Sequence, residues 1–326
     1  MTAAHPSAAA HTAQEFRVGT RASPLALIQT RDFIARITEA TSGLATPAVF
    51  LEHHIRTTGD AVQDRKLAEI GGKGLVAKEI HEAMRDGRID LAVHSLKDLE
   101  TALPDGIVLA CTLKREDARD ALILGPACTA PDPADPFACL PAGATIGTSS
   151  VRRQAQLLHA RPDLKIALLR GNVATRLART ENGDFAASLL ALAGLRRLGL
   201  EAHASLVLDP EAMVPSACQG IVGITARAAD TDLLQLLLSI QDAESRAAAT
   251  AERTMLALLD GSCNTPIGGY ARLLPDGTLH MTGLVASADG SFVLKRSLTG
   301  APDDAARIGA ELGAELRRDC PETLFA

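Results

Sequence analysis

The 326-residue chain has very few aromatic residues: no Trp, one Tyr and seven Phe, which together make up 2% of the sequence. Proteins that bind single-stranded nucleic acids stack the bases on aromatic rings, so this composition disfavours such a partner. The net charge also disfavours a nucleic-acid partner. The chain has 33 Lys and Arg and 39 Asp and Glu, which gives a net charge of −6. We therefore expect no nucleic-acid partner.

Long apolar runs and paired cysteines are also missing. No stretch approaches the roughly 20 apolar residues that a membrane-spanning helix needs. The six cysteines include no Cys-x-x-Cys pair, and a chain of this size does not need disulfides for stability. Residues 1–14 lack the basic start and apolar core of a signal peptide. We expect these residues to be a disordered leader on a reduced, cytoplasmic, monomeric protein with no membrane partner.

Neither a metal site nor a nucleotide loop is apparent. The adjacent His53 and His54 lie in a predicted strand, where neighbouring side chains point to opposite faces, so they cannot converge on a metal. The chain has no Gly-x-x-x-x-Gly-Lys-Ser/Thr loop, which weakens a nucleotide-binding hypothesis.

What the sequence does contain is a repeated strand–helix alternation. Strands are predicted at residues 16–19, 48–55, 89–93, 144–147, 165–169 and 187–192, and helices follow at 24–37, 75–84, 151–160, 173–178 and 193–198. Such alternation predicts parallel sheets that bind ligands at the carboxyl ends of their strands. An exposed loop rich in Pro, Ala and Asp, residues 127–142, divides the pattern into two α/β lobes.

The last part of the chain has a different pattern. A long helix is predicted at 243–259 and a closing helix at 301–318, with antiparallel strands at 267–274, 278–286 and 291–298 between them. The first two strands are joined at Pro275-Asp276-Gly277, which is a typical turn sequence. This region therefore predicts a smaller α+β domain with a three-stranded antiparallel sheet.

Basic residues recur where predicted strands pass into helices. They are Arg21, Lys73, Lys97, Arg152, Arg153, Arg170, Arg176, Arg196 and Arg197, and nearby hydroxyls are Ser23, Thr148, Ser149 and Ser150. A helix start presents free N–H groups that favour anions. Any one of these arginines could be an ordinary solvated surface charge. Their recurrence on one side of the sheets favours a polycarboxylate or polyphosphate ligand, because guanidinium pairs with such groups bidentately.

Two further residues could have chemical roles. Asp98 follows Lys97 at the end of an apolar strand. It could be a helix N-cap or an ion-pair partner, or a carboxylate that faces a cationic reaction centre. Cys263 lies in a Gly- and Pro-punctuated loop, residues 261–269. It could be a small buried side chain or a site of covalent chemistry.

Seven segments, in order along the chain, resemble the porphobilinogen deaminase (hydroxymethylbilane synthase) family. They are RVGTRASPLA at 17–26, IGGKGL at 70–75, AVHSLKD at 92–98, IGTSSVRR at 146–153, LRGNV at 169–173, AGLRRLG at 193–199 and GSCNTPIG at 261–268. Because the segments are collinear, together they are far more specific than any one of them.

The resemblance implies a transferase of haem biosynthesis. Such an enzyme joins four porphobilinogen molecules head to tail into hydroxymethylbilane and releases ammonia at each step. Growth starts from a dipyrromethane cofactor, which is held as a thioether on a cysteine that maps to Cys263. Each pyrrole unit carries an acetate and a propionate, so a basic cleft suits the growing chain.

The resemblance also implies a division into domains and roles for individual residues. Two lobes like those of periplasmic binding proteins, with mixed, mainly parallel sheets, would comprise residues 15–113 with about 219–240, and 117–215; the α+β domain would comprise 243–326. Asp98 would stabilise positive charge on pyrrole nitrogens and relay protons. The cofactor would be held by Lys97, Ser149, Ser150, Arg152, Arg153, Arg170 and Gly171. Substrate would be bound by Arg21, Ser23, Lys73, Thr148, Arg176, Arg197 and Gln219.

At several positions the chain departs from the family pattern. Glu69, Val76, Glu100, Ala186, Cys218, Thr225 and Ala248 stand where Lys, Phe, Pro, Asp, Gly, Glu and Arg are usual. Glu69 and Glu100 add negative charge near a site for anions, so a slower enzyme is one alternative. A noncatalytic anion-binding module is another, because it would share the two lobes and the basic cleft. Asp98 and Cys263 argue against it, since binding alone requires neither.

Overall fold

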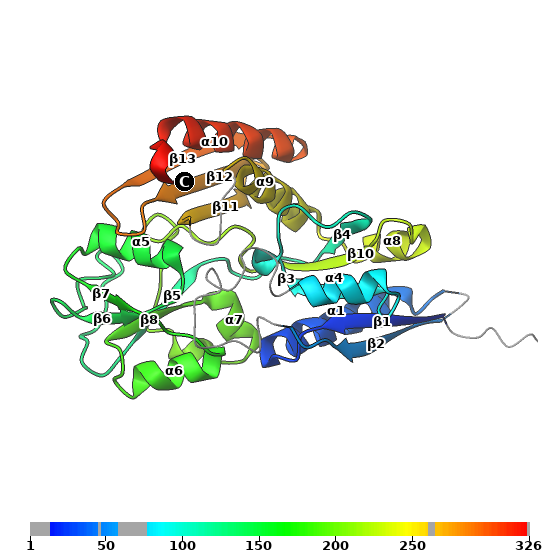
Figure 1. Ribbon diagram of the computed structural model, residues 1–326, viewed down its shortest axis with the longest axis horizontal. Helices are drawn as coiled ribbons and strands as arrows, with labels where there is room; N and C mark the ends of the chain where they lie inside the picture. Colours follow the sequence, from blue (N-terminus) through cyan, green and yellow to red (C-terminus); the bar gives the residue numbers. More distant parts are fainter. Residues whose placement is uncertain (1–13, 45–46, 58–76, 260–264, 325–326) are drawn as a thin grey trace, which may run out of the picture.

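Three β-sheets organise the computed structural model (Figure 1). It describes residues 14–44, 47–57, 77–259 and 265–324. Within these ranges, no helix is both long and apolar enough to cross a membrane. Several predictions fall outside the described residues: the leader up to residue 13, Glu69, the Lys73 loop, Val76 and Cys263.

The first sheet has five strands in the order β2-β1-β3-β10-β4. Their bounds are β1 Gln14–Thr20, β2 Ala48–His54, β3 Leu91–Ser95, β4 Ile107–Thr112 and β10 Val222–Arg227. The strand β1 pairs in parallel with β2 and β3, whereas β10 runs antiparallel to β3 and β4. The helices that belong to this part are α1 Pro24–Thr41, α4 Lys78–Arg85 and α8 Thr231–Leu238, and the short 3-10 turn η1, Leu96–Asp98, follows β3.

The second sheet repeats this plan in the order β7-β6-β8-β5-β9. Its strands are β5 Asp120–Leu124, β6 Thr145–Gly147, β7 Lys165–Ala167, β8 Ala187–Ala191 and β9 Leu206–Val207. Its helices are α5 Val151–Ala160, α6 Val173–Glu181 and α7 Leu192–Arg197, with the short η2 at Glu201–His203. Both sheets are mixed, as predicted, and each has two parallel and two antiparallel pairs among its described strands.

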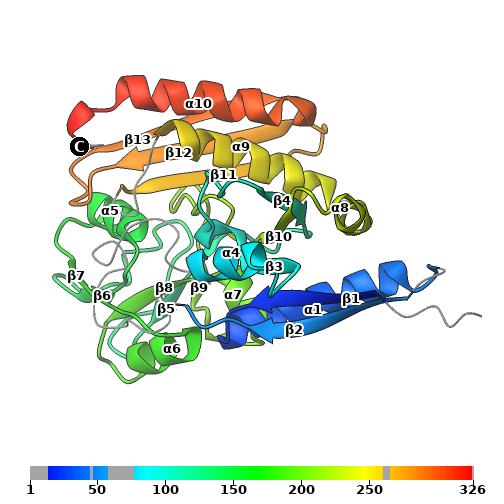
Figure 2. The ribbon, with the colours of Figure 1, turned by 45° about the vertical axis from the view of Figure 1, so that its right-hand side comes forward.

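The third sheet is antiparallel in the order β11-β12-β13, which confirms the predicted α+β region. Its strands are β11 Ile267–Leu273, β12 Leu279–Ala286 and β13 Val293–Gly300. The long helices α9 Ala243–Leu259 and α10 Ala305–Asp319 lie together on this sheet (Figure 2), and the short turns are η3 Pro302–Asp304 and η4 Glu322–Leu324. Met255, Met281, Leu312 and Leu316 are fully buried in the core of this part.

The helix starts are those that the capping residues predict. The Ser23 hydroxyl accepts a hydrogen bond from Ala26 N at 3.4 Å, and Pro24 occupies the first helical position of α1. The Ser150 hydroxyl caps α5 and the Asn172 side chain caps α6 in the same way. Residues 127–142 are irregular, as predicted, but not wholly exposed. Phe137, Cys139 and Leu140 are buried in the second sheet's core, because this Pro-rich loop carries an apolar cluster at its end.

The two five-stranded sheets are joined by two adjacent crossings, at residues 113–119 and 215–221. Glu116 N donates to Gly220 O at 3.1 Å, so the crossings are hydrogen-bonded to each other. Gly220 has φ +90°, and a Cβ there would collide with the Glu116 carbonyl oxygen. The neighbouring Cys218 also has a left-handed backbone, with φ 62°. Packing at this crossing therefore requires glycine at position 220.

Replacing Gly220 with Ala should lower the free energy of unfolding by about 2–4 kcal/mol, because left-handed strain and the collision add together. Gly199→Ala is the matched control, since Gly199 has φ +69° and open space around it. It should cost only about 1 kcal/mol, from the backbone conformation alone. Urea unfolding of both variants measures the difference; equal losses would contradict tight packing at the crossing.

Candidate active site

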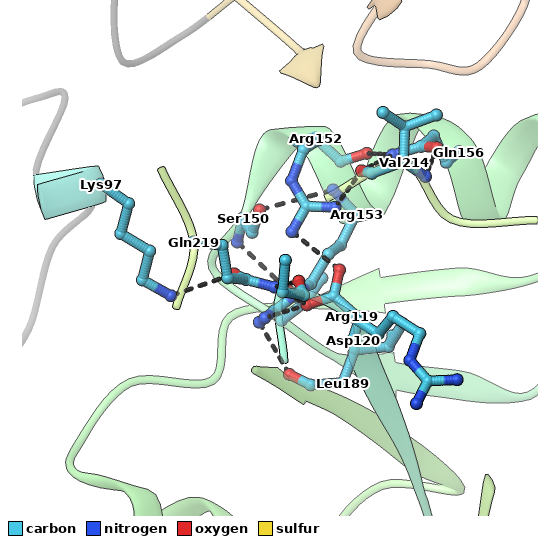
Figure 3. A network of polar contacts seen from close by, with 12 residues as sticks. Lys97, Arg119, Asp120, Ser150, Arg152, Arg153, Gln156, Leu189, Val214 and Gln219 are labelled. Atoms are coloured by element: carbon cyan, nitrogen blue, oxygen red, sulfur yellow. Dashed lines mark hydrogen bonds and ion pairs between the residues drawn. The ribbon is translucent and has the colours of Figure 1, made fainter. Parts of the chain in front are cut away.

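Asp120, the first residue of β5, is the centre of a buried charge cluster (Figure 3). Its carboxylate is completely buried and lies 2.8 Å from Arg152 Nη2 and 2.7 Å from Arg153 Nη2. Burial alone would raise the pKa of Asp120, but the two guanidinium groups outweigh it and hold that pKa well below its usual range. One carboxylate between two guanidiniums leaves the cluster positively charged.

A backbone carbonyl group holds one further donor of each arginine. Arg152 Nη1 donates to Val214 O at 2.7 Å, and Arg153 Nη1 donates to Leu189 O at 2.8 Å. Both side chains leave the first turn of α5, and both residues are buried. Their positions are therefore set before any ligand binds.

Gln219 joins this cluster to the first sheet. Its amide nitrogen donates to Asp120 Oδ1 at 2.9 Å and to Ala118 O at 2.7 Å, while its amide oxygen accepts from Lys97 Nζ at 3.1 Å (Figure 3). Lys97 belongs to η1, directly after β3. A residue of the crossing thus connects the carboxyl end of β3 with the second sheet.

The charge of Lys97 is affected by these neighbours. Burial lowers the pKa of Lys97 to about 8; Arg153 and Arg152 act in the same direction, whereas Asp98 and Asp120 oppose the shift. The side chain is nevertheless exposed to solvent.

Arg176 and Asp98 extend the cluster toward α6. Arg176 Nε donates to Gly171 O at 2.9 Å. Burial lowers the pKa of Arg176 to about 10, with Arg153 and Arg170 acting in the same direction and Asp98 opposing it. Asp98, which is exposed at the end of η1, therefore acts electrostatically on both Lys97 and Arg176.

The structure thus brings together many of the residues singled out in the sequence: Lys97, Asp98, Arg152, Arg153, Arg170, Gly171, Arg176 and Gln219. Thr148, Ser149 and Ser150 lie at the start of α5 beside this group. Ser150 N donates to Thr148 Oγ1 at 3.1 Å, and the Ser150 hydroxyl caps α5, so these two hydroxyls help to shape the helix start.

Three predicted substrate-binding residues have other neighbours. Arg197 Nη2 donates to Gly220 O at 2.8 Å, away from Asp120. Ser23 caps α1, and the charge of Arg21 acts on His94. Their predicted role in binding substrate stays a prediction.

Asp120 itself was missed in the sequence analysis. The available signal is a charged residue directly before the apolar run 121–124, because a charge at the start of a buried strand requires a partner. A second missed ion pair joins Arg115 of the crossing to the fully buried Glu252 of α9, with 2.6 Å between Arg115 Nη1 and Glu252 Oε1. Arg115 Nε also donates to Gln219 O at 2.8 Å, so the third domain supports the same glutamine.

The described departures from the family pattern include one charged residue, Glu100. Glu100 lies 3.2 Å from His81 of α4, so its negative charge has a partner outside the cationic cluster. The Thr225 hydroxyl lies 2.9 Å from His94 Nε2. Cys218 and Ala248 are buried, and the Ala186 carbonyl oxygen accepts a hydrogen bond from Cys128 Sγ. The expectation that Glu100 weakens anion binding stays a prediction.

The cluster fits a ligand with several carboxylates. Its cations include Lys97, Arg152, Arg153 and Arg176, and they outnumber the two carboxylates, Asp98 and Asp120. Positive charge therefore remains for an anionic group. Over the same ranges, no three metal-ligating side chains come together.

Asp120→Asn should destabilise the protein by about 3–5 kcal/mol, because two buried guanidiniums lose their counter-charge. Asp184→Asn is the control; it removes the partner of Arg179 from an exposed ion pair and should change stability little. Urea unfolding at neutral pH measures both. A loss for Asp120→Asn no larger than for the control would show that Asp120 does not hold the cluster together.

Comparisons with known proteins identify the family of the chain. The family model described as "Porphobilinogen deaminase, dipyromethane cofactor binding domain" matches residues 16–235, and "Porphobilinogen deaminase, C-terminal domain" matches 246–318. Porphobilinogen deaminase of Nitrobacter hamburgensis is 46% identical over 308 residues, covering 94% of each chain. The chloroplastic porphobilinogen deaminase of Oryza sativa is 45% identical over 303 residues, covering 92% of this chain and 83% of the relative.

Solved structures resemble the chain only distantly. A periplasmic sulfonate-binding protein of Methylobacillus flagellatus has a TM-score of 0.41 at 12% identity, covering 74% of this chain and 68% of that one. The periplasmic VFT2 domain of Bordetella pertussis BvgS has a TM-score of 0.40 at 13% identity, covering 71% and 87%.

The sequence matches cover the cofactor-binding region and the C-terminal domain alike, so a noncatalytic anion-binding module is not favoured. The chain belongs to the porphobilinogen deaminase (hydroxymethylbilane synthase) family of transferases, whose cofactor is dipyrromethane.

Proposed function

We propose that the Asp120 cluster holds the carboxylates of the dipyrromethane cofactor and of the growing pyrrole chain, with Asp98 as the catalytic carboxylate. The activity is that of the family, the joining of porphobilinogen molecules into hydroxymethylbilane in tetrapyrrole biosynthesis. One observation carries this proposal: buried arginines of the second sheet converge, through Gln219, on Lys97 and the exposed Asp98 of the first.

The cations act by charge and by position. Every unit of the growing chain brings two carboxylates, and Asp120 holds Arg152 and Arg153 in place before they bind. Little reorganisation is then needed when an anion arrives. Lys97, whose pKa is about 8, is positively charged at neutral pH, and a bound carboxylate would stabilise that charge further. Ser149, Ser150, Thr148, Arg170 and Gly171 add donors at the starts of α5 and α6.

Asp98 has a different role. It is the exposed carboxylate beside Lys97 and Arg176, on the short turn that ends β3. From there it can stabilise positive charge that develops on a pyrrole nitrogen, and it can accept and return a proton at a carboxylate oxygen. Arg21, Ser23, Lys73 and Arg197 are proposed as outlying contacts for substrate carboxylates.

Cys263 is proposed as the attachment point of the cofactor, which when bound supplies the pyrrole end to which new units are added. Two α/β domains, residues 15–113 with about 219–240 and 117–215, would form the binding cleft. The third domain, 243–326, would carry the cysteine. The crossings and Gln219 lie where these domains meet.

We further propose a cytoplasmic monomer as the working form. The described cysteines support a reducing compartment, because Cys111, Cys128, Cys139, Cys218 and Cys320 are all free thiols.

Attachment at Cys263 can be tested by intact mass. Protein purified from cells should exceed the mass of the polypeptide by two linked pyrrole units, and Cys263→Ser should remove this excess because no thiolate remains to form the thioether. Cys320→Ser, which alters a buried thiol, is the control and should keep the added mass. Equal masses for the wild type and Cys263→Ser would contradict attachment at this residue.

Asp98→Asn tests the catalytic role. The amide keeps the size of the side chain but removes its negative charge, so turnover of porphobilinogen should fall by about a hundredfold or more while cofactor loading and unfolding temperature stay close to wild type. Ammonia release measures turnover. Near-normal turnover in a loaded, folded variant would exclude Asp98 as the charge-stabilising carboxylate.

A further inference from the structure

Two buried histidines lie behind the turn that carries Asp98. His81 of α4 and His94 of β3 are only 2% and 8% exposed, and their ring centroids are 5.9 Å apart. Neither residue belongs to the cationic cluster around Asp120. Buried imidazole nitrogens need polar partners, so the groups that face each ring indicate its role.

His94 has a neutral partner. Its Nε2 lies 2.9 Å from the Thr225 hydroxyl of β10. Burial lowers the pKa of His94 to about 3, and His81, Arg21 and Arg253 act in the same direction, while Glu100 opposes the shift. His94 is therefore uncharged at neutral pH.

His81 has a carboxylate partner, Glu100. Its Nδ1 lies 3.2 Å from Glu100 Oε1, a close contact whose angles are not those of a hydrogen bond, and the glutamate side chain is only 14% exposed. Burial would raise the pKa of Glu100, but the contact with His81 outweighs burial and holds that pKa below its usual value. A charged carboxylate at this depth thus has its partner on α4, and it stands two residues after Asp98.

The same short segment is also held from the opposite side. Arg253 of α9 donates from Nη2 to Glu100 O at 2.7 Å and to Thr101 O at 3.0 Å. Leu99 N closes η1 by donating to Leu96 O at 3.2 Å. The residues directly after Asp98 are thus attached to α4 through a side chain and to α9 through the backbone.

We propose that Glu100 is a positioning residue, whose contact with His81 fixes the turn Leu96–Asp98 and hence the place of the Asp98 carboxylate. This inference rests on the proposed role of Asp98. Small displacements of a reacting group cost much activity, and about 1 Å corresponds to roughly a hundredfold in rate. A glutamate that only stabilised the fold would change unfolding and leave the turnover of folded enzyme unchanged.

The test compares Glu100→Gln with Glu181→Gln in cofactor-loaded enzyme. Glu181 also faces a histidine, His203, at 2.6 Å, but that pair is on the surface and far from η1 in sequence. Glu100→Gln should lower kcat about tenfold or more and leave KM for porphobilinogen within about twofold, because anion binding stays intact. The control should match wild type in both constants. An unchanged kcat for Glu100→Gln, or equal changes in the two variants, would overturn the proposal.

Variants of His81 keep the proposal testable if Glu100→Gln folds poorly. His81→Asn places an amide N–H near the position of Nδ1, so it can still hold the glutamate; His81→Ala cannot. The Asn variant should keep most of the wild-type kcat, and the Ala variant should lose about as much as Glu100→Gln. Equal kcat for the two would overturn the positioning role.

The Asp98→Asn variant distinguishes a failure of the proposed function from a failure of the positioning role alone. If Asp98→Asn keeps its turnover, the proposed function fails whatever Glu100 does. If Asp98→Asn is inactive while Glu100→Gln and His81→Ala are fully active, only the positioning role fails.

Discussion

The pairing of one buried carboxylate with two buried guanidiniums is the interaction on which the rest of the site depends. Asp120 lies at the start of a central strand, and Arg152 and Arg153 reach it from the first turn of α5. Without the carboxylate, two positive charges would be buried side by side. With it, they form a fixed, positively charged cluster beside one end of the second sheet.

Two sets of contacts connect the Asp120 cluster to the first sheet and to α9. Gln219 binds Asp120 with one end of its amide and Lys97 with the other, so the two five-stranded sheets share one polar network. Arg115 binds the backbone of Gln219 and pairs with Glu252 of α9, which ties the third domain to the same point. The segment directly after Asp98 is contacted from α4 by His81, at the Glu100 side chain, and from α9 by Arg253, at the Glu100 backbone. The proposed anion site and the turn that carries Asp98 thus both have contacts with more than one of the three sheets and their helices.

Much of the fold could be predicted from the sequence because its signals are local. Ser23-Pro24, Ser150 and Asn172 mark helix starts, and the Pro275-Asp276-Gly277 turn marks a hairpin. The strands β4, β5, β9 and β10 were not predicted individually, because they pair antiparallel across long sequence separations and do not alternate regularly with helices.

The cations of the proposed site were predicted from their positions at strand ends. Asp120, Glu252 and the His81–Glu100 contact were not, because their partners lie 19 to 137 residues away in the sequence. Arg197 was grouped with the cluster because it follows a strand end, yet its side chain binds the crossing.

The central claim is that a preassembled cationic cluster receives the carboxylates of cofactor and substrate. The most direct measurement is the titration of the Lys97 ammonium by NMR in cofactor-free and cofactor-loaded protein, with Lys97→Arg to assign the signal. The account predicts a pKa near 8 without cofactor, where burial and the arginines disfavour the charge, and a clear rise when anionic groups bind. A pKa near the ordinary 10.5 that stays the same on loading would contradict it.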